Sequence, residues 1–201
     1  MAGVAGRVAL VTGAGSDGGI GFATARLLKE AGARVAITST TDRIFDRLNE
    51  LPGDSSEAFA APADLTETAQ VEKLVSDATA ALGPIAIVVN NAGMVEISRD
   101  EPSGHLHSTT DEGWRYGLDI NLTSSFLVTR AVLTGMMERN YGRIVHMSSV
   151  TGPVVGIPGS AVYGAAKAGM LGMARSLAIE AGPYNVTVNC IGPGWIKTPS
   201  S

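Results

Sequence analysis

Residues 7–21 have the sequence RVALVTGAGSDGGIG, and this stretch decides the fold. Its apolar first part, Arg7–Thr12, predicts a short buried strand, and apolar residues then recur at helical spacing until Gly32 ends the helix. Glycines between a strand and a helix let backbone amides approach a pyrophosphate, which the helix N-terminus also attracts. In a chain with 25 glycines the alternative is an ordinary turn.

The same order of strand and helix continues along the chain. Further strands are expected at Arg34–Thr38, Ala58–Ala63, Ile85–Val89, Arg143–Ser148 and Val186–Ile191. Strands that alternate with helices predict an α/β fold, a doubly wound parallel sheet of the Rossmann type with helices on both faces. No linker or repeat divides the chain, so residues 1–201 are expected to form a single dinucleotide-binding and catalytic domain.

The expected helices carry their own signals. Asp42 is expected to cap the second helix and Thr66 the third, which Gly83-Pro84 ends. A long helix is expected to contain Trp114, Leu118 and Phe126, and another to run from about Ala161 to Ala181.

Composition and charge narrow the class of protein. Apolar residues make up 45% of the 201 residues and charged residues 17%, as in ordinary globular proteins. The net charge of −4 offers no basic surface for nucleic acid or an anionic membrane. No stretch reaches the ~18 apolar residues of a membrane helix, and no signal-peptide pattern opens the chain. Cys190 is the only cysteine, which favours a reducing, cytoplasmic location.

Polar motifs follow two of the expected strands, where ligands bind in open α/β sheets. The amides of Asn90-Asn91-Ala92-Gly93, after Ile85–Val89, could hold both the chain and a ribose, although an ordinary Asx turn would have the same sequence. Asp64-Leu65 follows Ala58–Ala63. Its carboxylate could accept a hydrogen bond from an adenine amino group, and the alternative is a surface acid.

Tyr163-Gly164-Ala165-Ala166-Lys167 is a candidate acid–base pair. The i, i+4 spacing places the phenol and the ammonium on one helix face. A free tyrosine has a pKa of about 10, and a nearby cation favours the phenolate. Ser149 of Ser148-Ser149 stands after another strand, where its hydroxyl could bind a carbonyl oxygen. The alternatives are an exposed pair and a serine that satisfies backbone groups.

In this order, the motifs resemble the short-chain dehydrogenase/reductase family over Val8 to Thr198, with 3-oxoacyl-acyl-carrier-protein reductases nearest. The resemblance implies that Tyr163 donates and accepts the proton and that Lys167 binds the nicotinamide ribose. It also implies that Ser149 orients the carbonyl and that Asn121 holds a water linked to Lys167. The residues expected to contact the cofactor are Gly13, Ser16, Asp17, Gly19, Ile20, Thr40, Arg43, Asp64, Leu65, Asn91, Ala92, Gly93, Tyr163, Lys167, Pro193, Gly194, Ile196 and Thr198.

Three features depart from the family pattern. The glycine turn is two residues longer than usual, which predicts a bulge near Ser16-Asp17-Gly18. The longer loop after Gly93 contains His105 and His107, but no third ligand accompanies them, so no metal is expected. Family members continue past Pro193-Gly194 with a lid, a helix and a strand. The natural polypeptide is therefore expected to extend beyond Ser201, with Ser200-Ser201 beginning a mobile lid.

The cofactor choice depends on the end of the second strand. The sequence there is Thr38-Ser39-Thr40-Thr41, without the acid that binds the ribose 2′-hydroxyl in NAD-dependent enzymes. Arg43 follows, and a guanidinium suits a 2′-phosphate, unless it is simply exposed beside a helix cap. This favours NADP over NAD.

The leading hypothesis is a ketoreductase or alcohol dehydrogenase, with sugar and other secondary alcohols open as substrates. An apolar set of Met94, Val155, Gly156 and Trp195 favours an acyl substrate, although Trp195 could instead lie in the core. A non-catalytic dinucleotide-binding sensor is the alternative, but it would not need Ser149, Tyr163 and Lys167 together. Nucleotide-sugar epimerases share the Tyr-Lys pair but are longer chains.

Assembly is expected from a sheet edge and two helices. An uncovered edge strand invites pairing, and the family packs two helices between subunits. A homo-oligomer, a tetramer or a dimer, is therefore expected. The helix residues expected at its interfaces are Ala131, Met136, Met137, Ala168, Met170 and Met173.

Overall fold

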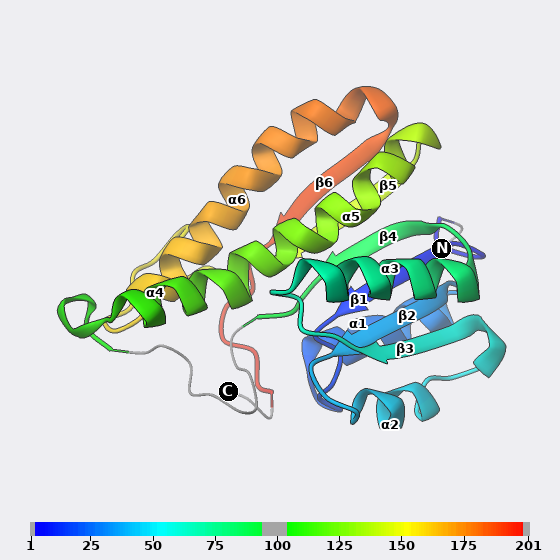
Figure 1. The fold of residues 1–201 in the computed structure, drawn as a ribbon, viewed down its shortest axis with the longest axis horizontal. Helices are drawn as coiled ribbons and strands as arrows, with labels where there is room; N and C mark the ends of the chain where they lie inside the picture. The colour runs from blue at the N-terminus through cyan, green and yellow to red at the C-terminus, as the bar shows by residue number, and fades with distance from the viewer. Residues whose placement is uncertain (1–2, 94–103, 199–201) are drawn as a thin grey trace.

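The computed structural model describes residues 3–93 and 104–198, so the expectations for Met94 and for Ser200-Ser201 lie outside the described residues. Six parallel strands form one sheet in the order β3-β2-β1-β4-β5-β6, which confirms the doubly wound fold (Figure 1). The strands are β1 (Val8–Thr12), β2 (Arg34–Ser39), β3 (Ala58–Pro62), β4 (Ile85–Asn90), β5 (Gly142–Met147) and β6 (Val186–Ile191).

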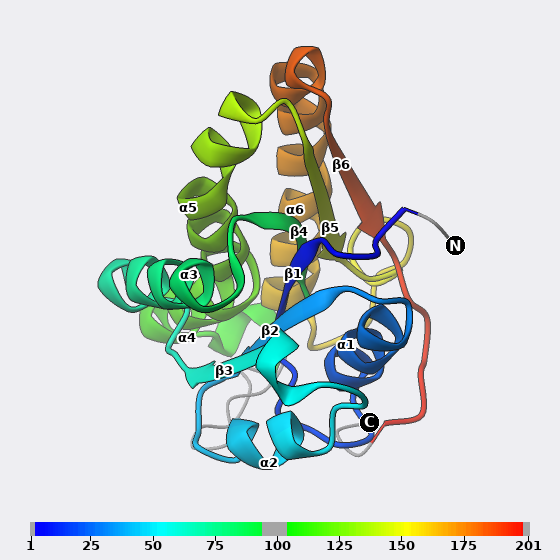
Figure 2. The ribbon, with the colours of Figure 1, turned by 90° about the vertical axis from the view of Figure 1, so that its right-hand side faces the viewer.

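The helices cover the sheet from both sides (Figure 2). Helices α3, α5 and α6 pack on one face, and α1 and α2 pack on the other. The helices are α1 (Ile20–Glu30), α2 (Ile44–Asn49), α3 (Thr68–Leu82), α4 (Asp111–Leu118), α5 (Ser124–Glu138) and α6 (Ala161–Ala181). No helix in the described ranges combines the length and the apolar character that crossing a membrane requires.

Strand β4 shows why the sheet has two apolar faces. Its run IAIVVN does not alternate with polar residues, as expected for a strand buried on both sides. Val88 packs into the core beneath α3 and α5, whereas Val89 packs into the core beneath α1. Full burial of such a side chain contributes about 1.5–3 kcal/mol. The sheet is therefore fixed between its helices, and its strand ends have defined positions.

Both capping predictions are wrong. Arg43 is the N-cap of α2 and makes no side-chain cap, while the Asp42 carbonyl accepts from Phe45 N. Glu67 is the N-cap of α3, because the Thr66 hydroxyl instead donates to Oδ1 of Asp64 at 2.6 Å. Before α3, the turn after the strand thus uses a hydroxyl that could have capped the helix.

The expected long helix has an interruption. Between α4 and α5, Asp119–Thr123 forms a π-helical segment, and Asn121 lies buried within it. Such single π turns are rare and occur frequently at functional sites. This segment sets the position of Asn121 relative to the ends of the strands.

Candidate active site

A cavity of about 1090 Å³ lies at the carboxyl ends of the strands, where the chain order reverses between β1 and β4. This switch point is where open α/β sheets bind ligands. The residues predicted as site residues that line it are Gly13, Ser16, Gly19, Ile20, Thr40, Arg43, Asp64, Leu65, Asn91, Ala92, Gly93, Ser149, Tyr163, Lys167, Pro193, Gly194, Ile196 and Thr198. Among the predicted residues, Asp17 and Asn121 do not line it.

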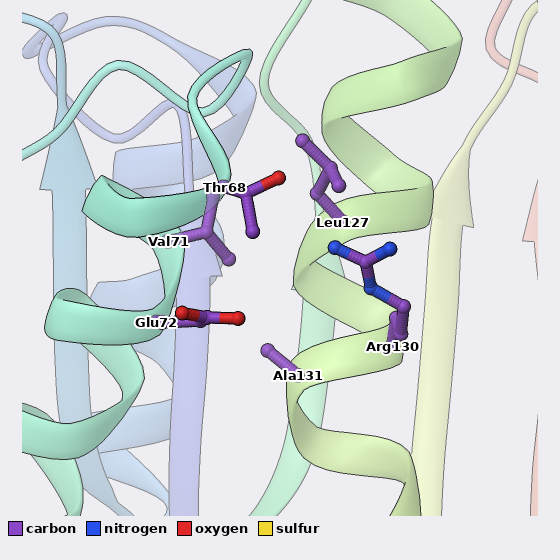
Figure 3. A pocket seen from close by; sticks show the side chains of 6 residues that line it. All are labelled: Thr68, Val71, Glu72, Leu127, Arg130 and Ala131. Atoms are coloured by element: carbon purple, nitrogen blue, oxygen red, sulfur yellow. The ribbon is translucent and has the colours of Figure 1, made fainter.

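A second, smaller hollow of about 110 Å³ lies between α3 and α5 (Figure 3). Glu72 and Arg130 line it from the two helices, together with the apolar side chains of Val71, Leu127 and Ala131. None of the predicted site residues lines it. The candidate active site is therefore the large cavity alone.

The glycine turn after β1 is built against the turn after β4. Gly13 has φ +67°, and a Cβ there would lie 2.7 Å from the Cα of Ala92. The Asn91 side-chain Nδ2 donates to the Thr12 and Gly13 carbonyls, each at 3.1 Å. A Cβ at Gly21 would lie 2.5 Å from both that Nδ2 and the Gly13 oxygen. Because these glycines have no side chain, the two turns pack closely together and form this part of the cavity wall.

The first turn of α1 can receive an anion. No side chain caps the helix at Gly19, so its free amides and the helix dipole are available at the cavity. A Cβ on Gly15 would lie 2.8 Å from Ser39 Cβ and 3.0 Å from the Nε of Arg43. Arg43 is exposed and lines the cavity at the end of β2.

The two acids predicted as cofactor contacts already make local contacts. Asp17 is exposed, and its carboxylate accepts from Gly18 N at 2.7 Å, so it stabilises the longer turn. Asp64 lines the cavity, but its Oδ1 accepts from both the amide and the hydroxyl of Thr66.

The Tyr163–Lys167 pair is not an exposed pair. Lys167 is only 3% exposed, and its Nζ lies 5.5 Å from the centroid of the Tyr163 ring. That ammonium donates to the Met147 carbonyl at 2.9 Å, at the end of β5. The Ser148 hydroxyl donates to the Lys167 carbonyl at 2.9 Å, and Oγ of Ser149 accepts from Thr151 N. The strand end and α6 are thus joined at Ser148, whereas Ser149 holds the loop that follows the strand.

Asn121 lies behind the cavity wall. It is 1% exposed, and its Nδ2 donates to the Gly117 carbonyl at 3.1 Å. A Cβ on Gly93, which has φ +145°, would lie 2.7 Å from Oδ1 of Asn121 and 3.3 Å from Nζ of Lys167. Gly93 therefore permits Asn121 and Lys167 to approach the same point.

His146 was missed by the sequence analysis. It lies on β5, is fully buried, and contacts Asn90. Burial and the nearby Lys167 charge lower its pKa to about 4, so it is neutral at pH 7. The available signal was a histidine two residues after Ile144, on the buried face of a predicted strand.

The mouth of the cavity is partly apolar. Trp195 is 88% exposed and lines the cavity, so the alternative of a core tryptophan is wrong. Val150 and Ile157 line the cavity, whereas Val155 and Gly156 do not. His105 and His107 stack with their ring centroids 5.7 Å apart, and the described residues contain no cluster of three potential metal ligands.

Comparison with known proteins identifies similar chains. The family model for short chain dehydrogenases matches residues 7–201. Nodulation protein G of Rhizobium sp. (strain N33) is 42% identical over 193 residues, which cover 96% of this chain and 74% of that protein. The 3-oxoacyl-[acyl-carrier-protein] reductase FabG of Vibrio cholerae is 40% identical and is matched over 75% of its length, again by 96% of this chain.

Solved structures agree. A crystal structure of an actinorhodin polyketide ketoreductase variant with NADPH matches with a TM-score of 0.87 and 37% identity. The match covers 96% of this chain and 72% of that one.

Proposed function

The chain belongs to the short-chain dehydrogenase family, and from that premise we propose that it is an NADP-dependent ketoreductase. One observation carries the proposal: Ser149, Tyr163 and Lys167 line the same cavity as the glycine turn. A bound nicotinamide supplies or accepts the hydride in such a reaction.

The residues present fit a dinucleotide. The glycines of the turn at Gly13–Gly21 let it pack closely against neighbouring segments, and the uncapped start of α1 suits a pyrophosphate. At the other end, Lys167 would hold ribose hydroxyls beside Gly93. Cofactor and catalytic residues then share one sheet, so we propose that residues 1–201 act as one domain.

Each catalytic side chain would have a distinct role. The Ser149 hydroxyl would donate to the substrate carbonyl oxygen. The Tyr163 phenol would give that oxygen its proton during reduction and take it back during oxidation. The buried Lys167 ammonium would favour the phenolate. Asn121 would fix the environment of Lys167 from behind Gly93.

The preference for NADP rests on the end of β2. Ser39 and Thr40 leave no acid beside the glycine turn, and the guanidinium of Arg43 lies close to Gly15. A guanidinium forms charge-assisted hydrogen bonds with phosphate. The similar ketoreductase was crystallised with NADPH, which supports this choice.

We propose an acyl carbonyl substrate, such as a 3-oxoacyl thioester. Val150, Ile157 and Trp195 give the cavity mouth an apolar character, and two similar proteins are named as reductases of oxoacyl or polyketide substrates. Sugar alcohols, which need a polar mouth, are the less favoured substrates.

A substrate panel tests the function. The purified protein would be mixed with NADPH or NADH and with 3-oxoacyl thioesters, simple ketones and sugars, while absorbance of reduced nicotinamide is followed. Oxidation of NADPH by thioesters is expected. NADPH binding without turnover on any carbonyl or alcohol would instead favour the sensor hypothesis, which Ser149, Tyr163 and Lys167 argue against.

We also propose a homo-oligomer, a tetramer or a dimer, in the cytoplasm. Phe126 on α5 and Ile179 on α6 are exposed apolar residues, and Ala168 on α6 is also exposed. Met136 and Met170 cannot belong to the interface as expected, because both are fully buried in the core. Light scattering at micromolar concentration tests the assembly, and a clean monomer would refute it.

A further inference from the structure

A cluster of three buried polar side chains lies behind the catalytic strand ends. Asn90 on β4 and His146 on β5 are register partners, and Thr129 on α5 faces them. Nδ2 of Asn90 lies 2.9 Å from Thr129 Oγ1 and 3.3 Å from Nδ1 of His146. The two N–H bonds of that amide thus have two acceptors, which leaves the imidazole proton on Nε2.

The cluster costs stability. Nε2 of His146 and Oδ1 of Asn90 are buried, and neither has a hydrogen-bond partner among the described residues. Buried polar atoms without partners are destabilising. Ile144, two residues earlier on the same face of β5, packs well in the core. An aliphatic residue would therefore suit this face, and the histidine points to a use other than packing.

The cluster adjoins two segments of the site: the one that holds the glycine turn and the one that holds Lys167. Asn90 directly precedes Asn91, whose side chain holds the carbonyls of the glycine turn. His146 directly precedes Met147, whose carbonyl accepts from the ammonium of Lys167. A shift of the imidazole would therefore move the carbonyl that positions Lys167.

The electrostatics favour a neutral imidazole here. Lys167 on α6 is the buried cation beside His146, and burial with this charge keeps the pKa of His146 near 4. Cys190 on β6 is the other register partner of His146, and burial raises the pKa of its thiol. At neutral pH the imidazole of His146 therefore adds no charge beside the ammonium that donates to the Met147 carbonyl.

We propose that His146, held by Asn90 and Thr129, is a positioning residue that orients Lys167 through the end of β5. It does not touch the substrate. This role rests on the ketoreductase function proposed above, and it gives the buried cluster a purpose that packing does not.

Four variants test the role by three measurements: kcat with a 3-oxoacyl thioester, the dissociation constant of NADPH, and Tm. His146→Leu should lower kcat by about 10- to 100-fold, as small displacements of catalytic groups do. It should weaken NADPH binding less, and Tm should stay equal or rise because an unsatisfied polar atom is removed. His146→Asn should restore most of kcat, because its amide takes the place of Nδ1.

Thr129→Val is the milder substitution. It keeps the side-chain shape, removes the acceptor of Asn90, and should lower kcat in the same direction by less. Ile144→Val is the matched control, since it loosens the same strand face outside the cluster. It should lower Tm and leave kcat unchanged.

Several outcomes would overturn the role. Wild-type kcat in both His146→Leu and Thr129→Val would do so, as would an equal loss of kcat in Ile144→Val. If His146→Leu does not fold, Thr129→Val alone decides. A wild-type protein that reduces no carbonyl would overturn the proposed function instead. The dissociation constants of NADPH for the four variants would then still test the positioning role, because Lys167 lines the cavity in which the cofactor would bind.

Discussion

The two halves of the sheet build the same cavity in opposite ways. On the β1–β2 side, the turns behind the cavity pack closely because Gly13, Gly15 and Gly21 have no side chain. On the β4–β5 side, it is backed by buried polar side chains such as Asn90 and His146. In the first half, an added side-chain atom should disrupt the packing of the turns. In the second half, activity should survive a change of side-chain volume but not the loss of a polar group.

The largest effect is expected at the catalytic half. Tyr163→Phe removes one oxygen and should lower kcat by about 10²–10⁴-fold, the usual contribution of general acid catalysis. NADPH affinity should hardly change. Tyr184→Phe, at a partly exposed tyrosine far along the chain, is the control. Near-normal kcat in Tyr163→Phe would refute its assignment as the acid. Lys167→Ala should differ by losing both rate and affinity.

A pH effect on stability should also arise in the catalytic half. The pKa of His146 is about 4 in the fold and 6.5 in the unfolded chain, so the unfolded chain binds more protons between these values. The free energy of unfolding therefore has its full His146 contribution above pH 6.5. This contribution falls by about 3 kcal/mol as the pH drops to 4. Urea unfolding at several pH values measures it. His146→Asn should flatten the slope, and an unchanged slope would contradict the prediction.

The dinucleotide half should respond to a single added methyl group. Gly21→Ala brings a Cβ against the Gly13 carbonyl and the Asn91 amide, and should destabilise the fold by about 1–3 kcal/mol. Gly172→Ala in α6 is the control, because a Cβ there meets nothing within 4 Å. It should stabilise the fold by about 0.5–1 kcal/mol. Equal effects in denaturant melts would show that contact at the turn does not matter.

A change of similar size concerns cofactor choice. Arg43→Ala should weaken NADPH binding by about tenfold or more and NADH binding far less, since a charge-assisted hydrogen bond contributes about 1.5–3 kcal/mol. Arg26→Ala, at an exposed arginine on α1, controls for loss of charge. Equal losses for both cofactors would rule out a contact with the 2′-phosphate, and a wild-type preference for NADH would reverse the choice.

Most of the fold could be predicted because its signals are local. The bounds of α6 and β6 were predicted to the residue, since periodicity and flanking glycines or prolines mark them. The cap at Thr66 was wrong because the turn before the helix uses its hydroxyl, and the cap at Asp42 was wrong because the helix starts one residue later, with Arg43 as the N-cap. Asp17 was placed at the cofactor because the sequence does not show which way a bulged turn presents its side chains.

The site was predictable only where its chemistry has a sequence motif. Ser149, Tyr163 and Lys167 were found through their spacing and the resemblance that they carry. His146 had a signal in its place on the buried face of a predicted strand, but its pairing with Asn90 and Thr129 could not be found, because it joins three elements far apart in the chain. The π-helical turn at Asn121 likewise follows from packing and has no local signature.

That π-helical turn has a consequence for how such a protein can diversify. Each residue of a helix advances by about 100°, so the wider turn at Asp119–Thr123 puts α4 and α5 out of phase. Glu112, Arg115 and Tyr116 of α4 line the cavity mouth while α5 packs against the core. Substitutions at the cavity-lining positions of α4 can therefore reshape the cavity and leave the packing of α5 against the core intact.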